Sequence, residues 1–176
     1  MHSKPFRDTQ HPLRRLATAG LAGALAEVLW IALFCAASGR STNGVLREIS
    51  ATVLAGSVDA AWAPAAGIIV HFALGVLIAI GFGVIVREGL LRGAAPRAQF
   101  IAALVGLAIV WAINFFVLLP VLNPAFVTIV PLSASLVSKL LFGVAMAMTL
   151  DRTPVTQLRS RASRALHGLT AQKLAG

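Results

Sequence analysis

Four polar side chains interrupt otherwise apolar stretches of the sequence, and they are the residues best suited to chemistry: Glu27, His71, Asn114 and Lys139. A carboxylate, an imidazole and an ammonium group can hold or pass a proton, bind an ion or recognise a small polar solute. Each of these groups is costly to bury in hydrocarbon unless it is paired or neutralised. We therefore expect them to face one another and not the lipid.

Two other roles are open for the same residues. Buried polar groups can serve only to fix the register of packed helices. A neutral imidazole in a membrane helix can also hold the metal of a haem or of a chlorophyll-type pigment. The remaining histidines, His2, His11 and His167, lie outside the apolar stretches. A bis-histidine haem within one chain is therefore not expected, and we expect no bound cofactor.

Motifs of known catalytic chemistry do not occur in the sequence. There is no GxGxxG or Walker pattern, no HExxH, no CxxC and no Ser/His/Asp set on a nucleophile elbow. The single cysteine, Cys35, can supply neither an intramolecular disulfide nor a paired thiolate metal site. We expect no enzyme, no catalytic residue and no metal site.

The polar residues lie in four stretches that are long enough to cross a bilayer: residues 17–38, 64–86, 98–119 and 132–150. A crossing needs about 20 apolar residues, and the backbone in lipid must bond within its own segment, which favours α-helices. The chain of 176 residues is 58% apolar, with a mean hydropathy of +0.86. The sequence predicts an all-α membrane protein with a four-helix transmembrane domain over residues 17–150.

The basic residues predict the orientation in the membrane. Twelve of the 15 lysines and arginines fall in the tails, residues 1–16 and 151–176, or in the loop between the second and third stretches, and two fall in the first loop. Because basic residues collect on the cytoplasmic side, both termini are expected in the cytoplasm. The net charge is +9, and we expect the basic residues to contact the anionic headgroups of the lipid bilayer and not nucleic acid.

The first loop carries a helical pattern. Ser41-Thr42 is a candidate helix cap, and apolar residues follow it at helical spacing: Leu46, Ile49, Val53 and Leu54. This pattern predicts a short helix lying on the outer interface, with Trp62 at the headgroup level where the second span begins. A solvated connector is the alternative interpretation.

The third loop, PVLNPAFVTIVP, carries no charge and contains Pro120, Pro124 and Pro131. Three prolines are expected to prevent a continuous helix. The apolar residues between them predict a segment that packs on the outer mouth of the bundle or against another subunit. A hydrophobic turn in the headgroup region is the alternative.

The C-terminal tail begins with a helix-start signal, Thr153 followed by Pro154. Its apolar residues recur on one face, and arginines on the other faces are expected to contact lipid headgroups: Arg159, Arg161 and Arg164. The pattern predicts an amphipathic helix on the cytoplasmic leaflet, and a disordered tail is the alternative.

A rise of about 1.5 Å per helical residue gives each polar group a depth. Glu27, His71 and Lys139 fall at a common level slightly outward of the bilayer centre, and Asn114 falls nearer the outer mouth. Small residues, which let membrane helices approach closely, lie one or two turns from these groups on the same faces: Gly20, Gly23, Gly67, Gly75, Ser135 and Gly143. We predict a Glu27–Lys139 ion pair with His71 within reach.

The second and fourth spans echo each other. HFALGVLIAI at His71–Ile80 matches KLLFGVAMAM at Lys139–Met148, and VLWIALF at Val28–Phe34 matches IVWAINF at Ile109–Phe115 more faintly. Both hairpins start on the same side, so the echo predicts a parallel repeat. Compositional bias alone is the alternative.

A family resemblance rests on three parts of the sequence. They are the IVHF stretch at Ile69–Phe72, the residues Gly106, Trp111 and Pro120 in and after the third span, and Phe142-Gly143 in the fourth span. Over roughly residues 69–148 the chain resembles the YagU-like inner-membrane proteins of bacteria, a four-span family. The resemblance implies a multi-pass location in the bacterial inner (cytoplasmic) membrane and a link to acid tolerance. It transfers no catalytic residue.

These observations lead to two functional expectations. The first is a small multi-pass membrane protein whose buried Glu27/His71/Lys139 cluster handles protons, ions or a small polar solute, as a homo-oligomer or with a partner in a membrane complex. The second is a non-catalytic structural or assembly subunit of a larger membrane complex, with the small-residue faces and the uncharged outer loop as docking surfaces.

Overall fold

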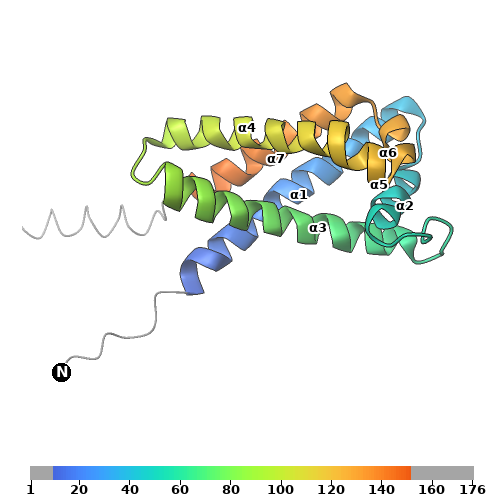
Figure 1. The fold of residues 1–176 in the computed structure, drawn as a ribbon, viewed down its shortest axis with the longest axis horizontal. Coiled ribbons are helices and arrows are strands. Elements are labelled where there is room, and N and C mark those ends of the chain that lie inside the picture. The colour runs from blue at the N-terminus through green and yellow to red at the C-terminus, as the bar shows by residue number, and fades with distance from the viewer. Residues whose placement is uncertain (1–9, 152–176) are drawn as a thin grey trace, which may run out of the picture.

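The structure is a computed structural model that describes residues 10–151, and over this range it holds four helices long and apolar enough to cross a membrane (Figure 1). The spanning segments are Leu13–Ser38, Ala63–Val86, Pro96–Leu122 and Leu132–Leu150. The prediction of an all-α protein with four spans is confirmed. The predicted helix of the C-terminal tail, with its three arginines, lies outside the described residues.

The first span and the loop after it follow their sequence signals. Helix α1 (Gln10–Ser38) ends where Gly39 adopts a φ of 68° and the Arg40 N–H bonds to the Cys35 carbonyl at 2.9 Å, an arrangement that favours glycine. Helix α2 (Thr42–Val53) begins at the predicted cap, where Ser41 Oγ accepts a hydrogen bond of 3.2 Å from the Gly44 N–H.

Helix α2 packs against the bundle and is not a solvated connector. Its Val45 and Leu46 are buried, and the Leu46 carbonyl lies directly against Gly67 of α3 (Ala63–Gly81). Two residues of the predicted apolar stripe, Val53 and Leu54, are exposed instead. The predicted helix is therefore present, and its buried face is turned toward α3.

The third span departs from expectation at Pro120. Helix α4 (Pro96–Ile113) continues through a π-helix, η2 (Asn114–Leu118), into α5 (Leu119–Leu122), so Pro120 lies inside the spanning segment. A proline removes one backbone donor and clashes with the preceding turn, and the wider π turn directly before it is the local adjustment that accommodates the ring. The third loop holds no continuous helix, as expected, but the break comes at Asn123 and not at Pro120.

The remaining elements complete the two hairpins. The second span continues from α3 into a π-helix, η1 (Phe82–Leu90). Asn123 ends α5 and caps α6 (Pro124–Ile129), its Oδ1 accepting from the Phe126 N–H at 3.3 Å. Helix α7 (Leu132–Asp151) is the fourth span. The uncharged third loop is thus largely helical.

The spanning helices are arranged around α1 and α7. Helix α1 packs against α3 and against α7, α7 packs against α4, and α4 meets the second span mainly at η1. Figure 1 shows α2, α5 and α6 gathered at one end of the bundle and the η1–α4 turn at the other. Helices α3 and α4 pack little against each other beyond that turn.

All six residues predicted to pack helices together are buried: Gly20, Gly23, Gly67, Gly75, Ser135 and Gly143. A Cβ added at Gly20 would lie 2.6 Å from the Gly75 carbonyl oxygen, and one at Gly23 would lie 2.9 Å from the Phe142 ring. Contacts this close exist because the side chain is missing. The glycines bring α1 against α3 and α7, the two helices that carry its ionisable partners.

Two apolar clusters bracket the middle of the bundle. The larger contains Ala24, Ala79, Leu107, Phe142 and Met146 among others, and lies toward the η1–α4 turn. The smaller comprises Cys35, Val45, Val130 and Ala134 at the end covered by α2 and α6. Between the two clusters lie Glu27 on α1 and Ser135, Ser138 and Lys139 on α7, which is where the candidate site lies.

Candidate functional site

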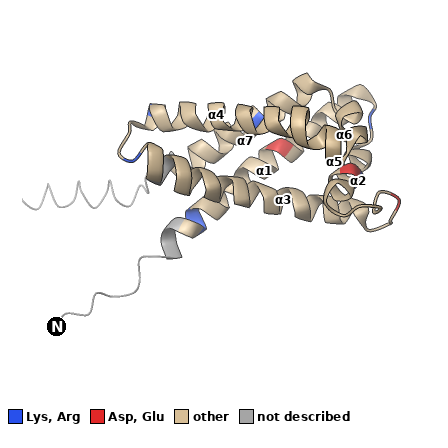
Figure 2. Cartoon of the chain, in the orientation of Figure 1, with Lys and Arg blue, Asp and Glu red and all other residues tan. Residues whose placement is uncertain are grey.

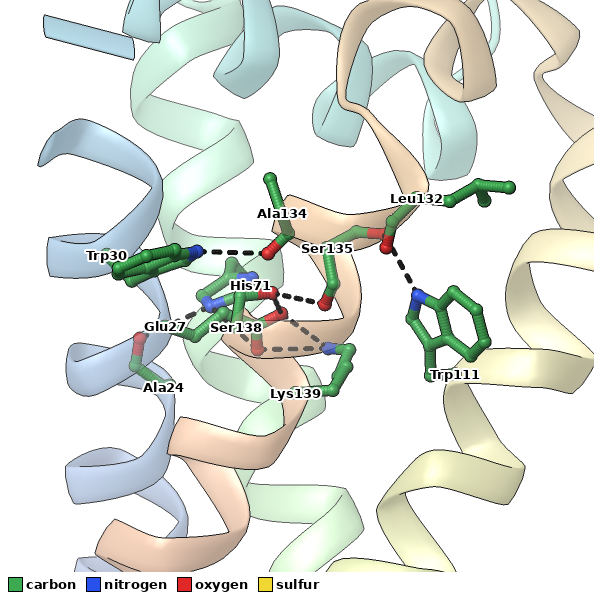
Figure 3. A network of polar contacts seen from close by, with 10 residues as sticks. All are labelled: Ala24, Glu27, Trp30, His71, Trp111, Leu132, Ala134, Ser135, Ser138 and Lys139. Carbon is green, nitrogen blue, oxygen red and sulfur yellow. Dashed lines mark hydrogen bonds and ion pairs between the residues drawn. The ribbon is translucent and has the colours of Figure 1, made fainter. Parts of the chain in front are cut away.

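Glu27 and Lys139, which the sequence predicts to pair, form an ion pair between α1 and α7 (Figure 3). Lys139 Nζ lies 2.8 Å from Glu27 Oε1 and 2.9 Å from Oε2. The Glu27 side chain is only 8% exposed, so its charge depends on this partner. Figure 2 shows most charged residues toward the ends of the bundle, with an acidic position on α1 and a basic position on α7 between them.

His71 joins the pair from α3. Its Nε2 lies 3.7 Å from Glu27 Oε2 and 3.3 Å from the Ala24 carbonyl oxygen. A hydrogen bond to that carbonyl requires a proton on Nε2, which leaves Nδ1 as the acceptor in the neutral ring. Among the side chains that the structure describes, no three of His, Cys, Asp or Glu are grouped so as to hold a metal ion.

A chain of hydroxyl and indole groups supports the pair, and the sequence reasoning missed this role. Ser138 Oγ lies 3.1 Å from Glu27 Oε1 and 2.7 Å from the Ser135 carbonyl oxygen, so its one proton is shared between two acceptors. Trp111 Nε1 donates to Ser135 Oγ at 2.9 Å, and Trp30 Nε1 donates to the Ala134 carbonyl at 2.9 Å. Both tryptophans thereby fix the first turns of α7, the helix that carries Lys139.

A cavity of about 160 Å³ lies against the cluster. The polar lining residues are Glu27, His71, Asn114, Ser135, Ser138 and Lys139 from the spanning helices and Thr42 and Thr52 from α2. The apolar lining residues are Val28, Ile31, Val45, Leu46, Ile49, Val53, Leu74, Phe115, Leu119, Phe126 and Val130. Because Val53 and Leu74 are exposed, the cavity reaches the surface of the protein.

Asn114 belongs to the cavity and not to the ion pair. It begins the π-helix η2, and its side chain is half-buried. Within residues 10–151 the Asn114 amide makes no side-chain hydrogen bond. The four polar residues singled out in the sequence thus all line one cavity, and two of them, His71 and Lys139, lie against Glu27.

A second polar contact holds the cover of this cavity in place. Buried Asn123 directs its Nδ2 to three acceptors on α2: the Glu48 carbonyl at 3.1 Å, Glu48 Oε2 at 2.9 Å and Thr52 Oγ1 at 3.1 Å. Its position before Pro124 is a helix-start signal, and that signal could have identified it from the sequence.

The predicted repeat has a counterpart in the packing. His71 and Lys139, which align in the repeat, both contact Glu27. Gly75 packs on α1 and Gly143 packs on α4, each against the preceding spanning helix of its own hairpin. Trp30 and Trp111 also align, and both donate to α7.

The fold and the cluster define a small multi-pass membrane protein, built from four apolar helices around a buried glutamate with histidine and lysine partners. The chain matches no family model, no curated protein and no solved structure. The likeness to the YagU-like proteins stays a prediction.

Proposed function

We propose that this membrane protein binds a small polar solute, together with protons, at the Glu27/His71/Lys139 cluster. The observation that carries the proposal is the cavity of about 160 Å³ that all three groups line. A cluster that served only to set helix register would have no need of space beside it. Pockets with mostly apolar walls and a few convergent polar groups are the usual form of small-molecule sites.

The size of the cavity bounds the solute. An apolar cavity of about 150 Å³ holds one benzene molecule, so the present one accommodates a ligand of about six non-hydrogen atoms. The ionisable groups come from α1, α3 and α7, and α2 and α6 contribute mainly apolar side chains. A solute of this size would reach the ion pair without displacing a helix.

The orientation of the site follows from the basic residues. With both termini in the cytoplasm, the cavity under α2 and α6 is reached from the opposite side of a bacterial inner membrane. Four spans enclose little volume, so passage of the solute across the membrane would require a second copy of the chain or a partner subunit. No catalytic step is part of the proposal.

The test is ligand-induced thermal stabilisation of the purified protein in mild detergent, with amines, amides, alcohols and carboxylates of four to six non-hydrogen atoms. One class should raise the melting temperature of the wild-type protein and of Asp59→Asn, a control because Asp59 is exposed and does not line the cavity. The same class should have no effect on Glu27→Gln. If no class stabilises the protein, or if Glu27→Gln responds like the wild type, the proposal fails and an assembly subunit is favoured.

A further inference from the structure

We infer that the ligand of this cavity is a small monocarboxylate with a short hydrocarbon body, bound by Lys139 and Asn114 together with one proton. The inference rests on the proposed function and names the class of solute. It follows from the hydrogen-bonding groups that the cluster leaves unused, from the balance of charge and from the lining of the cavity.

Lys139 and Asn114 both offer the cavity hydrogen-bond donors that no described residue uses. The Lys139 ammonium has three hydrogens, and its partners within residues 10–151 are the two oxygens of Glu27 and, at 5.9 Å, the ring of Phe142. The Asn114 amide, which also lines the cavity, has two further N–H donors without a partner in the described range. A ligand that brings acceptor oxygens would satisfy both groups.

Acceptors, in contrast, are mostly occupied. Glu27 Oε1 receives Lys139 and Ser138, and Oε2 receives Lys139 with His71 at 3.7 Å. An amine or other cation would have to displace Lys139 from this carboxylate and leave one of two positive charges without a partner. A carboxylate ligand can instead accept a hydrogen bond from the part of the Lys139 ammonium group that Glu27 does not use. Such a bond is strong because both partners are charged.

Charge balance requires a proton. The Glu27–Lys139 pair is neutral as a unit, so a second carboxylate adds one negative charge in a site where unpaired charge is costly. The titratable groups lining the cavity are Glu27 on α1, His71 on α3 and Lys139 on α7, and α2, η2, α5 and α6 supply none. Proton uptake by His71 at Nδ1 restores neutrality, because the positive charge of the imidazolium, whose Nε2 lies 3.7 Å from Glu27 Oε2, balances the added carboxylate.

The walls of the cavity determine the chemical character of the rest of the ligand. Most of the other lining groups are aliphatic or aromatic, including Val28, Ile31, Ile49, Phe115 and Phe126. A second carboxylate would place a further charge against these side chains without a cationic partner. Butyrate, with one carboxylate and a three-carbon tail, has the number of non-hydrogen atoms that this volume admits.

Isothermal titration calorimetry on the intact protein in detergent tests this inference with butyrate, butylamine, butanamide and butanol. Butyrate should bind best, taking up one proton as measured in two buffers of different ionisation enthalpy. Its affinity should fall about tenfold from pH 7 to pH 8, as uptake of one proton requires.

Three variants probe the assigned contacts. Asn114→Leu, which keeps the ion pair, should weaken butyrate binding at least fivefold, whereas Asp59→Asn, at an exposed position outside the cavity, should leave the affinity for butyrate unchanged. Lys139→Arg keeps the charge and should retain binding. His71→Gln should abolish the proton uptake.

The outcomes separate the inference from the proposed function. Binding of butylamine or butanol in preference to butyrate overturns the carboxylate inference, but it leaves the proposed function of the cavity as a binding site for a small polar solute intact. Butyrate binding that ignores Asn114→Leu, or that takes up no proton, also overturns the inference. If none of the four probes binds, both proposals fail.

Discussion

Replacing Lys139 by methionine is expected to leave Glu27 as a buried carboxylate without a cationic partner. Methionine fills similar volume but donates no proton. In Lys139→Met, Glu27 would keep only the Ser138 hydroxyl at 3.1 Å and the His71 ring at 3.7 Å. Removing one partner of a buried ion pair costs about 3–5 kcal/mol of the free energy of unfolding.

An upper limit follows from the other course open to the carboxylate, which is to take up a proton. Protonating a glutamate at pH 7 costs about 3.7 kcal/mol, given a pKa of about 4.3 in water and 1.36 kcal/mol per unit. We therefore expect Lys139→Met to lower the free energy of unfolding by about 3–4 kcal/mol at pH 7. The loss should shrink by about 1.4 kcal/mol for each unit of acidification, because the folded variant holds a proton that its unfolded chain releases.

Titration with sodium dodecyl sulfate, followed by tryptophan fluorescence at pH 7 and pH 6, measures both quantities. Leu141→Met, at an exposed position of the same helix, introduces the same residue and should change the free energy of unfolding by less than about 0.5 kcal/mol. The double variant Glu27→Gln/Lys139→Met should recover about 2 kcal/mol or more, because neither charge is then unpaired. A loss below about 1 kcal/mol at pH 7, or strictly additive effects in the double variant, would refute the reasoning.

Three further predictions concern packing, the cover of the cavity and topology. Gly20→Ala should lower the free energy of unfolding by about 1–3 kcal/mol, because its Cβ would lie 2.6 Å from a backbone carbonyl of α3. Gly106→Ala is the control, because a Cβ there meets no neighbouring atom within 4 Å, and it should not lower this free energy. The same detergent titration measures both variants. Asn123→Ala should speed amide hydrogen exchange across residues 42–53 without changing α1, because three hydrogen bonds to α2 are lost, and unchanged exchange there would contradict this. Reporter fusions at Thr128 and at the C-terminus should lie on opposite sides of the membrane, and a result on the same side would overturn the four-span topology.

The ion pair was predictable because it depends only on the depth of each residue in the membrane and on the helix face that carries it. The rise per residue in a helix is constant, so counting from the ends of the apolar stretches places Glu27 and Lys139 at one depth. Gly23 and Gly143, one turn away on the same faces, indicated which sides of the helices pack together. Neither step requires the crossing angles of the helices.

The supporting contacts were not predictable in the same way. Ser138 carries no sequence signal of its own, and its bond to Glu27 depends on the rotation of α7 relative to α1, which the spacing of residues along one helix does not reveal. The π-helix before Pro120 and the cavity beneath α2 likewise depend on how helices cross and where short elements come to rest. Asn123 is an exception, because an asparagine before a proline is a local signal.

The sequence separation of 112 between Glu27 and Lys139 also corresponds to a time during biosynthesis. At about 5–20 residues per second, Glu27 is made about 6–22 s before its partner. The first span therefore meets the membrane with a carboxylate that has no lysine beside it, and His71 is the first partner to be synthesised. The pair closes only when α7 reaches α1, so a chain arrested before its fourth span leaves Glu27 unmatched. The ion pair is thus a marker of complete insertion as well as a part of the site.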